Sequence, residues 1–173
     1  IIADGWSAEV FEVELSVAYS ARVRGKAVVL PAPELQYADY AMWQRTWLSG
    51  VEGGRQLGYW REELKDLETL DLPTDRLRPT VQSYRGTRLV VVLPRELVGR
   101  LTALGRAESA TPFMTLLAAF MVLLHRYTGA EDIALGTQIA GRRRTELKGL
   151  MGVFLNTLVL RGNLAGEPSF REL

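Results

Sequence analysis

The residues of this chain that could do chemistry are few and lie far apart in the sequence. Asp4-Gly5, next to the N-terminus, could form a cap and a turn before a helix. The single histidine, His125, lies near an expected helix end, where stabilising the helix dipole is a more common role than catalysis. Arg142-Arg143-Arg144 could clamp a phosphate, although a run of charges in a loop is more often a solvated face. By residue type and spacing alone, these groups assemble no catalytic site.

The composition excludes several classes of function. The 173 residues include no cysteine, which rules out disulfides, thiol catalysis and cysteine metal sites, and one histidine cannot build a histidine-rich metal site. A net charge of +1 gives no electrostatic case for nucleic acid or an anionic membrane as the main partner. The longest apolar run, at about residues 113–124, is too short to span a bilayer, and no signal peptide precedes the first helix. We therefore expect a cytoplasmic protein.

Apolar periodicity predicts the elements that must position the candidate groups. Helices are expected over about residues 7–24, 37–48, 56–67, 94–107 and 111–129, and strands over about 85–93, 132–137 and 153–161. The helix after Thr111-Pro112 has the clearest start, because threonine is a good cap and proline suits the first helical position. The β-branched run at residues 85–93 predicts a strand that is covered on both faces. This order of helices and strands predicts an α/β layered domain, and we expect its helices to lie on a mixed sheet.

Three short sequence motifs resemble those of a known protein family, which the apolar periodicity alone does not indicate. The first, Ile1-Ile2-Ala3-Asp4-Gly5-Trp6-Ser7, resembles the end of a His-His-x-x-x-Asp-Gly motif. The second, Tyr37-Ala38-Asp39-Tyr40-Ala41-Met42-Trp43, resembles Tyr-x-Asp-Tyr-Ala-x-Trp. The third, Met151-Gly152-Val153-Phe154-Leu155-Asn156-Thr157, resembles Ile-Gly-x-Phe-Val-Asn-Thr and continues to Arg161. In this order and spacing, they make essentially the whole chain similar to the condensation domains of nonribosomal peptide synthetases.

The resemblance implies a fold and a place within it. The family's full domain is well over twice this length and has two chloramphenicol-acetyltransferase-like lobes around a tunnel. Residues 1–173 would be a partial condensation domain that holds the end of the active-site motif and much of the C-terminal lobe. The N-terminal lobe would be missing, and the two histidines would lie immediately before Ile1. A first residue other than methionine, and a last segment, 170–173, that reads as the start of a helix, also predict a piece of a longer chain.

The resemblance also implies the activity of the parent protein. The family is an acyltransferase that forms amide bonds between thioesters carried on the 4′-phosphopantetheine arms of donor and acceptor peptidyl carrier proteins. A neighbouring adenylation domain is expected, no directly bound cofactor or metal is implied, and the fragment without its catalytic histidine is expected to be inactive. Two alternatives stay open: a non-catalytic lobe that docks carrier proteins, and a stand-alone acyltransferase of the same superfamily.

The resemblance assigns roles to individual motif residues. Asp4 is expected to pair with an arginine of the missing lobe and hold its loop, and Gly5 to permit a tight backbone path under the tunnel. Asn156 is either a satisfied core amide or a polar group that faces the tunnel near the thioesters. The other motif residues are expected to be scaffold: Tyr37, Asp39, Tyr40, Trp43, Gly152, Phe154, Thr157 and Arg161.

Overall fold

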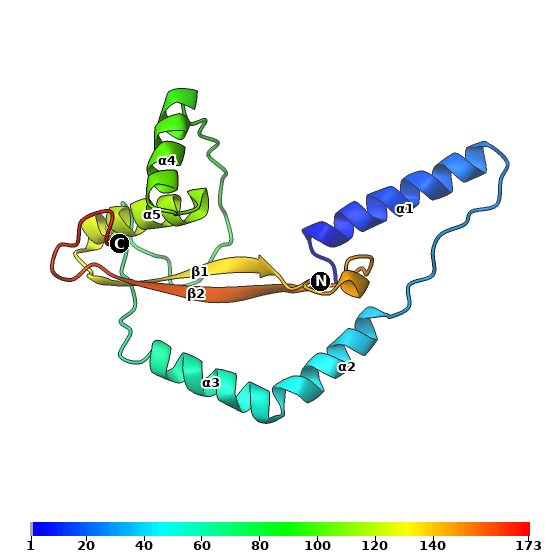
Figure 1. Cartoon of the computed structure of the whole chain (residues 1–173), viewed down its shortest axis with the longest axis horizontal. Coiled ribbons are helices and arrows are strands. Elements are labelled where there is room, and N and C mark those ends of the chain that lie inside the picture. The colour runs from blue at the N-terminus through cyan, green and yellow to red at the C-terminus, as the bar shows by residue number, and fades with distance from the viewer. Residues whose placement is uncertain (1) are drawn as a thin grey trace. The chain divides into compact units, whose positions relative to one another are not determined.

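The computed structural model describes residues 2–173, which form five α-helices, one short 3₁₀-helix and two β-strands (Figure 1). The elements are α1 (Gly5–Val23), α2 (Tyr37–Leu48), α3 (Val51–Glu63), α4 (Arg95–Ala107), α5 (Pro112–Thr128), β1 (Asp132–Ala140), the 3₁₀-helix Thr145–Leu147 and β2 (Leu155–Asn163). Ile1, the first residue of the N-terminal motif, lies outside the described residues. The combination of helices and sheet agrees with the predicted α/β class.

The strands β1 and β2 lie side by side as a two-stranded sheet (Figure 1). At one end, the backbone N–H of Leu164 donates to the carbonyl of Glu131, and at the other end Gly141 donates to Phe154. The residues paired with β1 therefore run in the opposite chain direction, so the two strands are antiparallel. The expected mixed sheet is wrong for residues 2–173, because a mixed sheet needs at least three strands.

The chain divides into two compact units. The first comprises Ile1–Asp66 and Gly136–Val159, and the second comprises Leu67–Leu135 and Leu160–Leu173. Each unit has a small apolar core of its own. In the first unit the core consists of Leu147, Leu150 and Phe154, and in the second of Met121, Leu124, Ile133 and Leu164. Every candidate site residue except Arg161 belongs to the first unit.

Helix ends follow local signals where those signals are strong. The side chain of Thr111 accepts a hydrogen bond from the backbone of Met114, Pro112 occupies the first position of α5, and Gly129 ends the helix at φ +74°. Gly25, at φ +64°, likewise follows the end of α1. These boundaries, and those of α2, confirm the predicted ones to within two residues.

The start of α3 was predicted too late. The helix begins at Val51 rather than at about residue 56, and Gly53 and Gly54 lie inside it although glycine weakens helices. A Cβ at Gly53 would lie 1.8 Å from the carbonyl oxygen of Leu48. Glycine is therefore required by the close approach to the end of α2, which apolar periodicity does not encode.

The predicted strand at residues 85–93 is wrong. Its central residues have no regular structure and are highly exposed, with Leu89 at 85%, Val90 at 76% and Val92 at 86%. A strand needs a neighbour for its backbone N–H and C=O groups, and within residues 2–173 β1 and β2 pair only with each other. Residues 170–173 form a turn rather than the start of a helix.

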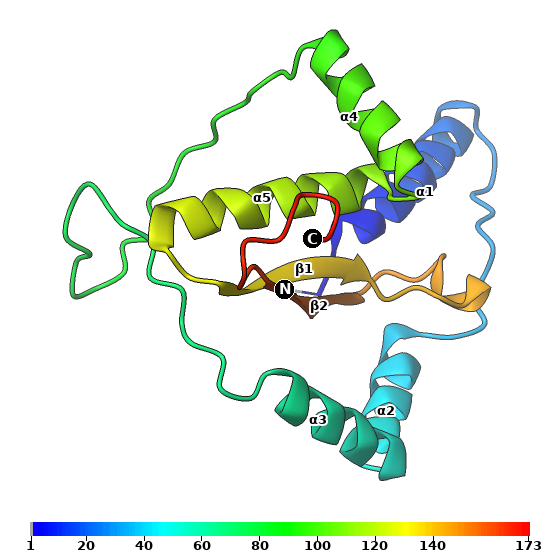
Figure 2. The ribbon, with the colours of Figure 1, turned by 60° about the vertical axis from the view of Figure 1, so that its left-hand side comes forward.

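Helices α4 and α5 form a sharply bent pair (Figure 2), with an angle of 104° at the break between them. Their contact requires a small residue, since a Cβ at Gly105 would lie 2.8 Å from Oγ1 of Thr115. Among residues 2–173, no single helix is long and apolar enough to cross a membrane, and α4 and α5 meet those criteria only when they are taken together.

Candidate functional site

Asp4 stands at the N-terminus of α1, and both of its carboxylate oxygens are occupied. Oδ1 accepts hydrogen bonds from the backbone N–H of Ser7 at 2.9 Å and from the Ser7 hydroxyl at 2.8 Å. Oδ2 accepts the backbone N–H of Phe154 at 3.1 Å, from the segment that leads into β2. Asp4 thus caps its own helix and ties it to a segment 150 residues away.

Arg142 is the cationic partner of Asp4. Its Nη2 lies 3.1 Å from Asp4 Oδ1, and the two side chains are only 2% and 3% exposed. The Nη1 group donates to the carbonyl oxygens of Leu147 and Leu150, both at 2.6 Å, and Nη2 also donates to the carbonyl of Gly152 at 3.2 Å. The guanidinium group of Arg142 therefore binds three backbone carbonyls of the loop between β1 and β2.

Ser7 completes this buried cluster. Its hydroxyl lies 2.8 Å from the carbonyl oxygen of Gly152, accepts the Gly152 backbone N–H at 3.0 Å and accepts from Arg142 Nη2 at 3.0 Å. Because a hydroxyl has a single proton, Asp4 Oδ1 and the Gly152 carbonyl compete for it. Removing the hydroxyl would leave the buried N–H of Gly152 without its acceptor, which is costly.

An aromatic wall supports the guanidinium of Arg142. Its central carbon lies 3.9 Å from the ring centroid of Phe154, a cation–π contact. The ring of Phe154 packs against those of Tyr37 and Tyr40, at centroid distances of 5.3 and 4.7 Å. The Tyr37 hydroxyl donates to the carbonyl oxygen of Val153 at 2.9 Å. Burial, together with the nearby Tyr37, raises the pKa of Tyr40 above its ordinary value.

The electrostatics of the cluster keep Asp4 ionised. Burial alone would raise the pKa of this carboxyl group, but the hydrogen bonds from Phe154, Ser7 and Arg142 outweigh that effect. The net result holds the pKa of Asp4 well below its usual range. A carboxylate in this state is a fixed negative charge rather than a proton acceptor at neutral pH.

The structure corrects two expectations about this cluster. The arginine that pairs with Asp4 is Arg142 of this chain, not a residue of a missing lobe. Arg142 is also no part of a solvated face, whereas the adjacent Arg143 and Arg144 are exposed. Arg142 lies two residues beyond the end of β1 at Ala140, whereas that strand was predicted to end at about residue 137, so no sequence signal marked Arg142 as buried.

Three other motif residues have surroundings that differ from those of the buried cluster around Arg142. Gly5 is at the first position of α1, and a Cβ there would meet no described atom within 4 Å. Its expected role under the tunnel stays a prediction. Asn156 is exposed on β2 and accepts the Thr157 N–H at 2.9 Å, which contradicts the core-amide alternative. Arg161, in the second unit, pairs with Asp132 through two guanidinium nitrogens.

Several predicted scaffold residues do pack together. Gly152 is buried against Tyr37, and a Cβ on Gly152 would lie 2.1 Å from Tyr37 Cδ2. Asp39 accepts the backbone N–H of Gln36 at 2.8 Å and so stabilises the start of α2. Trp43 is half exposed and lies 5.7 Å from Tyr40 between ring centroids.

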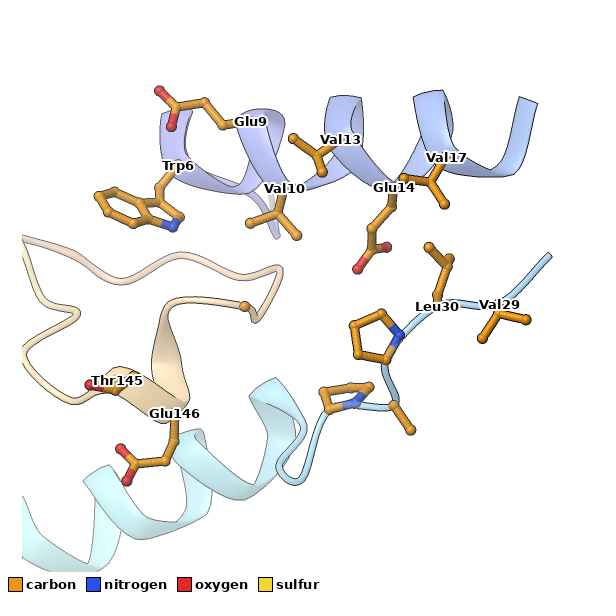
Figure 3. A pocket seen from close by; sticks show the side chains of 14 residues that line it. Trp6, Glu9, Val10, Val13, Glu14, Val17, Val29, Leu30, Thr145 and Glu146 are labelled. Carbon is orange, nitrogen blue, oxygen red and sulfur yellow. The ribbon is translucent and has the colours of Figure 1, made fainter. Parts of the chain in front are cut away.

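Two concave surfaces of the first unit differ in charge. The acidic groove, of about 690 Å³, lies between α1 and the connector at residues 29–33 (Figure 3), where Val10 and Leu30 provide apolar surface. Its charged lining residues are Glu9, Glu14 and Glu146, so the groove does not suit an anion. The arginine pocket, of about 390 Å³, lies between α2 and the loop after β1 and includes Arg143 and Arg144. In the described part of the chain, no three acidic or histidine side chains are grouped to hold a metal ion.

Comparisons with known proteins agree on one family. The model of the condensation domain matches residues 1–173. A linear gramicidin synthase from Brevibacillus parabrevis is 53% identical over all of this chain, and chondramide synthase of Chondromyces crocatus is 43% identical. The chain spans only 3% and 4% of the length of these two relatives.

Solved structures give the same result. The X-domain from teicoplanin biosynthesis, in its complex with OxyB, matches 99% of this chain with a TM-score of 0.91 and 31% identity. The first condensation domain of the calcium-dependent antibiotic synthetase, in complex with a substrate analogue, matches 99% with a TM-score of 0.71 and 27% identity. The matched regions make up 39% and 38% of those chains.

Proposed function

The chain belongs to the condensation domain family, and we propose that its parent protein forms amide bonds between aminoacyl or peptidyl groups carried as thioesters on peptidyl carrier proteins. The family match over residues 1–173 is the observation that carries this proposal. The relatives that are peptide synthetases, including one that makes linear gramicidin, support it. Because the chain spans a small part of those relatives, the activity is assigned to the parent and not to the 173 residues.

The proposed reaction is an acyl transfer from sulfur to nitrogen. The α-amine of the acceptor attacks the thioester carbonyl of the donor, a C–N bond forms, and the C–S bond breaks. The amine loses one proton, and the released phosphopantetheine thiolate gains one. Such a step depends on alignment of the two tethered groups, an unprotonated amine and stabilisation of the developing oxyanion.

In this proposal Asp4 is architectural, and the catalytic group is the second of two histidines immediately before Ile1. The low pKa of Asp4 and its four hydrogen bonds support a fixed carboxylate over a proton carrier. By holding the start of α1, the ion pair with Arg142 would also hold the chain that enters this helix. The fragment without the histidines is then expected to be inactive.

Asn156 is our candidate for a residue that faces the substrate tunnel. Its side chain is exposed on β2, and its oxygen accepts a local hydrogen bond from the Thr157 N–H. The NH₂ group of an amide whose oxygen accepts a local bond can still donate to a thioester carbonyl or a substrate amide. The exposure of this side chain supports the tunnel role over the core role.

The partners that follow from the proposal are the donor and acceptor carrier proteins, the N-terminal lobe of the domain and a neighbouring adenylation domain. The substrates would arrive on 4′-phosphopantetheine, and no other cofactor is proposed. The cytoplasmic location expected from the sequence also stays a prediction.

Docking without catalysis is the second candidate function. It is favoured by the likeness to the X-domain of teicoplanin biosynthesis, which was solved as a complex with a second protein, OxyB. A chain of this fold could therefore present a binding surface to a partner without joining two substrates.

One reconstitution separates the two candidates. The full parent condensation domain would be mixed with a donor and an acceptor carrier protein, each loaded with an aminoacyl thioester, and the carrier-bound products analysed by mass spectrometry. We expect a dipeptidyl thioester on the acceptor carrier, and its loss when the second histidine is replaced by alanine. Carrier binding without product in the wild-type domain would favour docking. Product from the isolated 173 residues would refute the placement of the catalytic histidine.

A further inference from the structure

Residues 152–154, which we call the β2 entry, lie directly before β2 and are held by hydrogen bonds to the start of α1. The backbone N–H of Gly152 donates to the Ser7 hydroxyl at 3.0 Å, and the N–H of Phe154 donates to Asp4 Oδ2 at 3.1 Å. All of these residues belong to the first unit. Side chains of the N-terminal motif thus fix the first and the last residue of the β2 entry.

Tyr37, the first residue of α2, holds the residue between them. Its hydroxyl donates to the carbonyl oxygen of Val153 at 2.9 Å. Its ring meets the ring of Phe154 edge to face at a centroid distance of 5.3 Å, and it lies so close to Gly152 that no side chain fits between them. Because the ring is packed against both residues, the hydroxyl is held in place to bind the Val153 carbonyl.

The β2 entry sets the register of β2 against β1. The N–H of Gly141 donates to the carbonyl of Phe154 at 2.9 Å, so the pairing of the two segments begins within the entry. Side chains of a strand alternate between two faces, and a shift of one residue turns each of them to the opposite face. Asn156 is the second residue of β2, and its side chain is exposed. The face to which Asn156 points therefore depends on how the β2 entry is held.

We propose that Tyr37 is a positioning residue for Asn156 in amide formation. The bond from the Tyr37 hydroxyl to Val153 holds the backbone three residues before Asn156, and the orientation of the Asn156 amide follows from that backbone. Tyr37 acts through the β2 entry and not on the substrate. This inference rests on the proposed function, in which Asn156 faces the substrate tunnel. It gives the Tyr37 hydroxyl a role beyond the scaffold role expected for this residue.

Steady-state kinetics of the full parent condensation domain with loaded carrier proteins test the proposal. Tyr37→Phe removes the hydroxyl and keeps the ring. We expect kcat for amide formation to fall about tenfold, which corresponds to about 1.4 kcal/mol and to the loss of one hydrogen bond, with KM for the loaded carriers unchanged. In the Asn156→Ala background, Tyr37→Phe should have no further effect on kcat, because the residue that Tyr37 positions is gone. If Tyr37 were only scaffold, kcat of the folded Tyr37→Phe domain would stay normal.

Tyr40→Phe is the matched control. The ring of Tyr40 also packs on Phe154, at a centroid distance of 4.7 Å, but its hydroxyl accepts a hydrogen bond from Gln44 of the same helix. This change should therefore leave kcat unchanged. Melting curves would verify that every variant is folded.

Hydrogen exchange gives a measurement that does not depend on activity. In mass spectrometry of peptides that cover residues 150–157, backbone amides should exchange several times faster in Tyr37→Phe than in wild type, and at the wild-type rate in Tyr40→Phe. If the wild-type domain forms amides, then normal kcat in Tyr37→Phe, additive losses in the double variant or unchanged exchange at residues 150–157 would each overturn the role of Tyr37 alone. If the wild-type domain forms no amide, the proposed function fails, and the role of Tyr37 fails with it.

Discussion

The carboxylate of Asp4 and the guanidinium of Arg142 are 138 positions apart in the chain and form an ion pair at 3.1 Å. Both side chains are almost fully buried. Taking two charges out of water is expensive. The cost is offset by hydrogen bonds that Ser7 and Phe154 donate to Asp4 and by those that Arg142 donates to three backbone carbonyls. The ion pair thereby joins the start of α1, the loop after β1 and the entry to β2.

Loss of the guanidinium should be strongly destabilising. Arg142→Ala leaves Asp4 as an uncompensated buried charge and the carbonyls of Leu147 and Leu150 without their donor, so we expect the free energy of unfolding to fall by about 3–5 kcal/mol. Urea denaturation of the parent condensation domain measures this change. The exposed Arg144, replaced by alanine, is the control and should change stability by less than about 0.5 kcal/mol. A similar effect for both variants would contradict the special role of Arg142.

The stability of the domain should depend on pH through Asp4. The pKa of Asp4 is lower in the folded state than the value of about 3.9 in an unfolded chain. As the pH falls, Asp4 is therefore protonated first in the unfolded state, which is stabilised relative to the folded state. The stabilisation by Asp4 is therefore complete above about pH 4 and is lost progressively at lower pH. Thermal unfolding between pH 2 and 7 should show a gap between wild type and Asp4→Asn that narrows below about pH 4. A constant gap would count against the ion pair.

A side chain at Gly152 should be poorly tolerated. The Cβ of Gly152→Ala would lie 2.1 Å from Tyr37 Cδ2, and displacement of that packed ring should cost about 1–3 kcal/mol of unfolding free energy. Gly54→Ala is the control, because no described atom lies within 4 Å of its Cβ inside α3. That change should stabilise the domain by up to about 1 kcal/mol. Equal effects in chemical denaturation would show that Tyr37 does not pack on Gly152.

Replacement of Asn156 should separate stability from turnover. Because the side chain is exposed, Asn156→Ala should change the unfolding free energy by less than about 0.5 kcal/mol. If Asn156 orients a thioester or a substrate amide in the parent domain, amide formation should slow about tenfold for each 1.4 kcal/mol of lost transition-state stabilisation. Asn163→Ala provides the control, since Asn163 is also exposed on β2 and accepts a local backbone bond. Equal turnover in wild type and Asn156→Ala would remove Asn156 from the tunnel.

Local sequence signals predicted most helices, because the interactions that start and end a helix lie within a few residues. The Thr111 cap, Pro112 and Gly129 place α5 without any knowledge of the rest of the fold. The motifs, which are also continuous in sequence, identified the family that the match over residues 1–173 confirms. Their order along the chain was sufficient for that conclusion.

Interactions between distant segments were decided only by the tertiary structure. The β-branched residues at 85–93 favour an extended backbone, but a strand also needs a partner, and none of the described residues supplies one. The three consecutive arginines at 142–144 are chemically identical, so no local signal tells which of them is buried. Arg142 is buried because Asp4, Ser7 and Gly152 converge on it from two other segments and offset the cost of removing its charge from water. Arg143 and Arg144 lack such a set of partners and stay exposed.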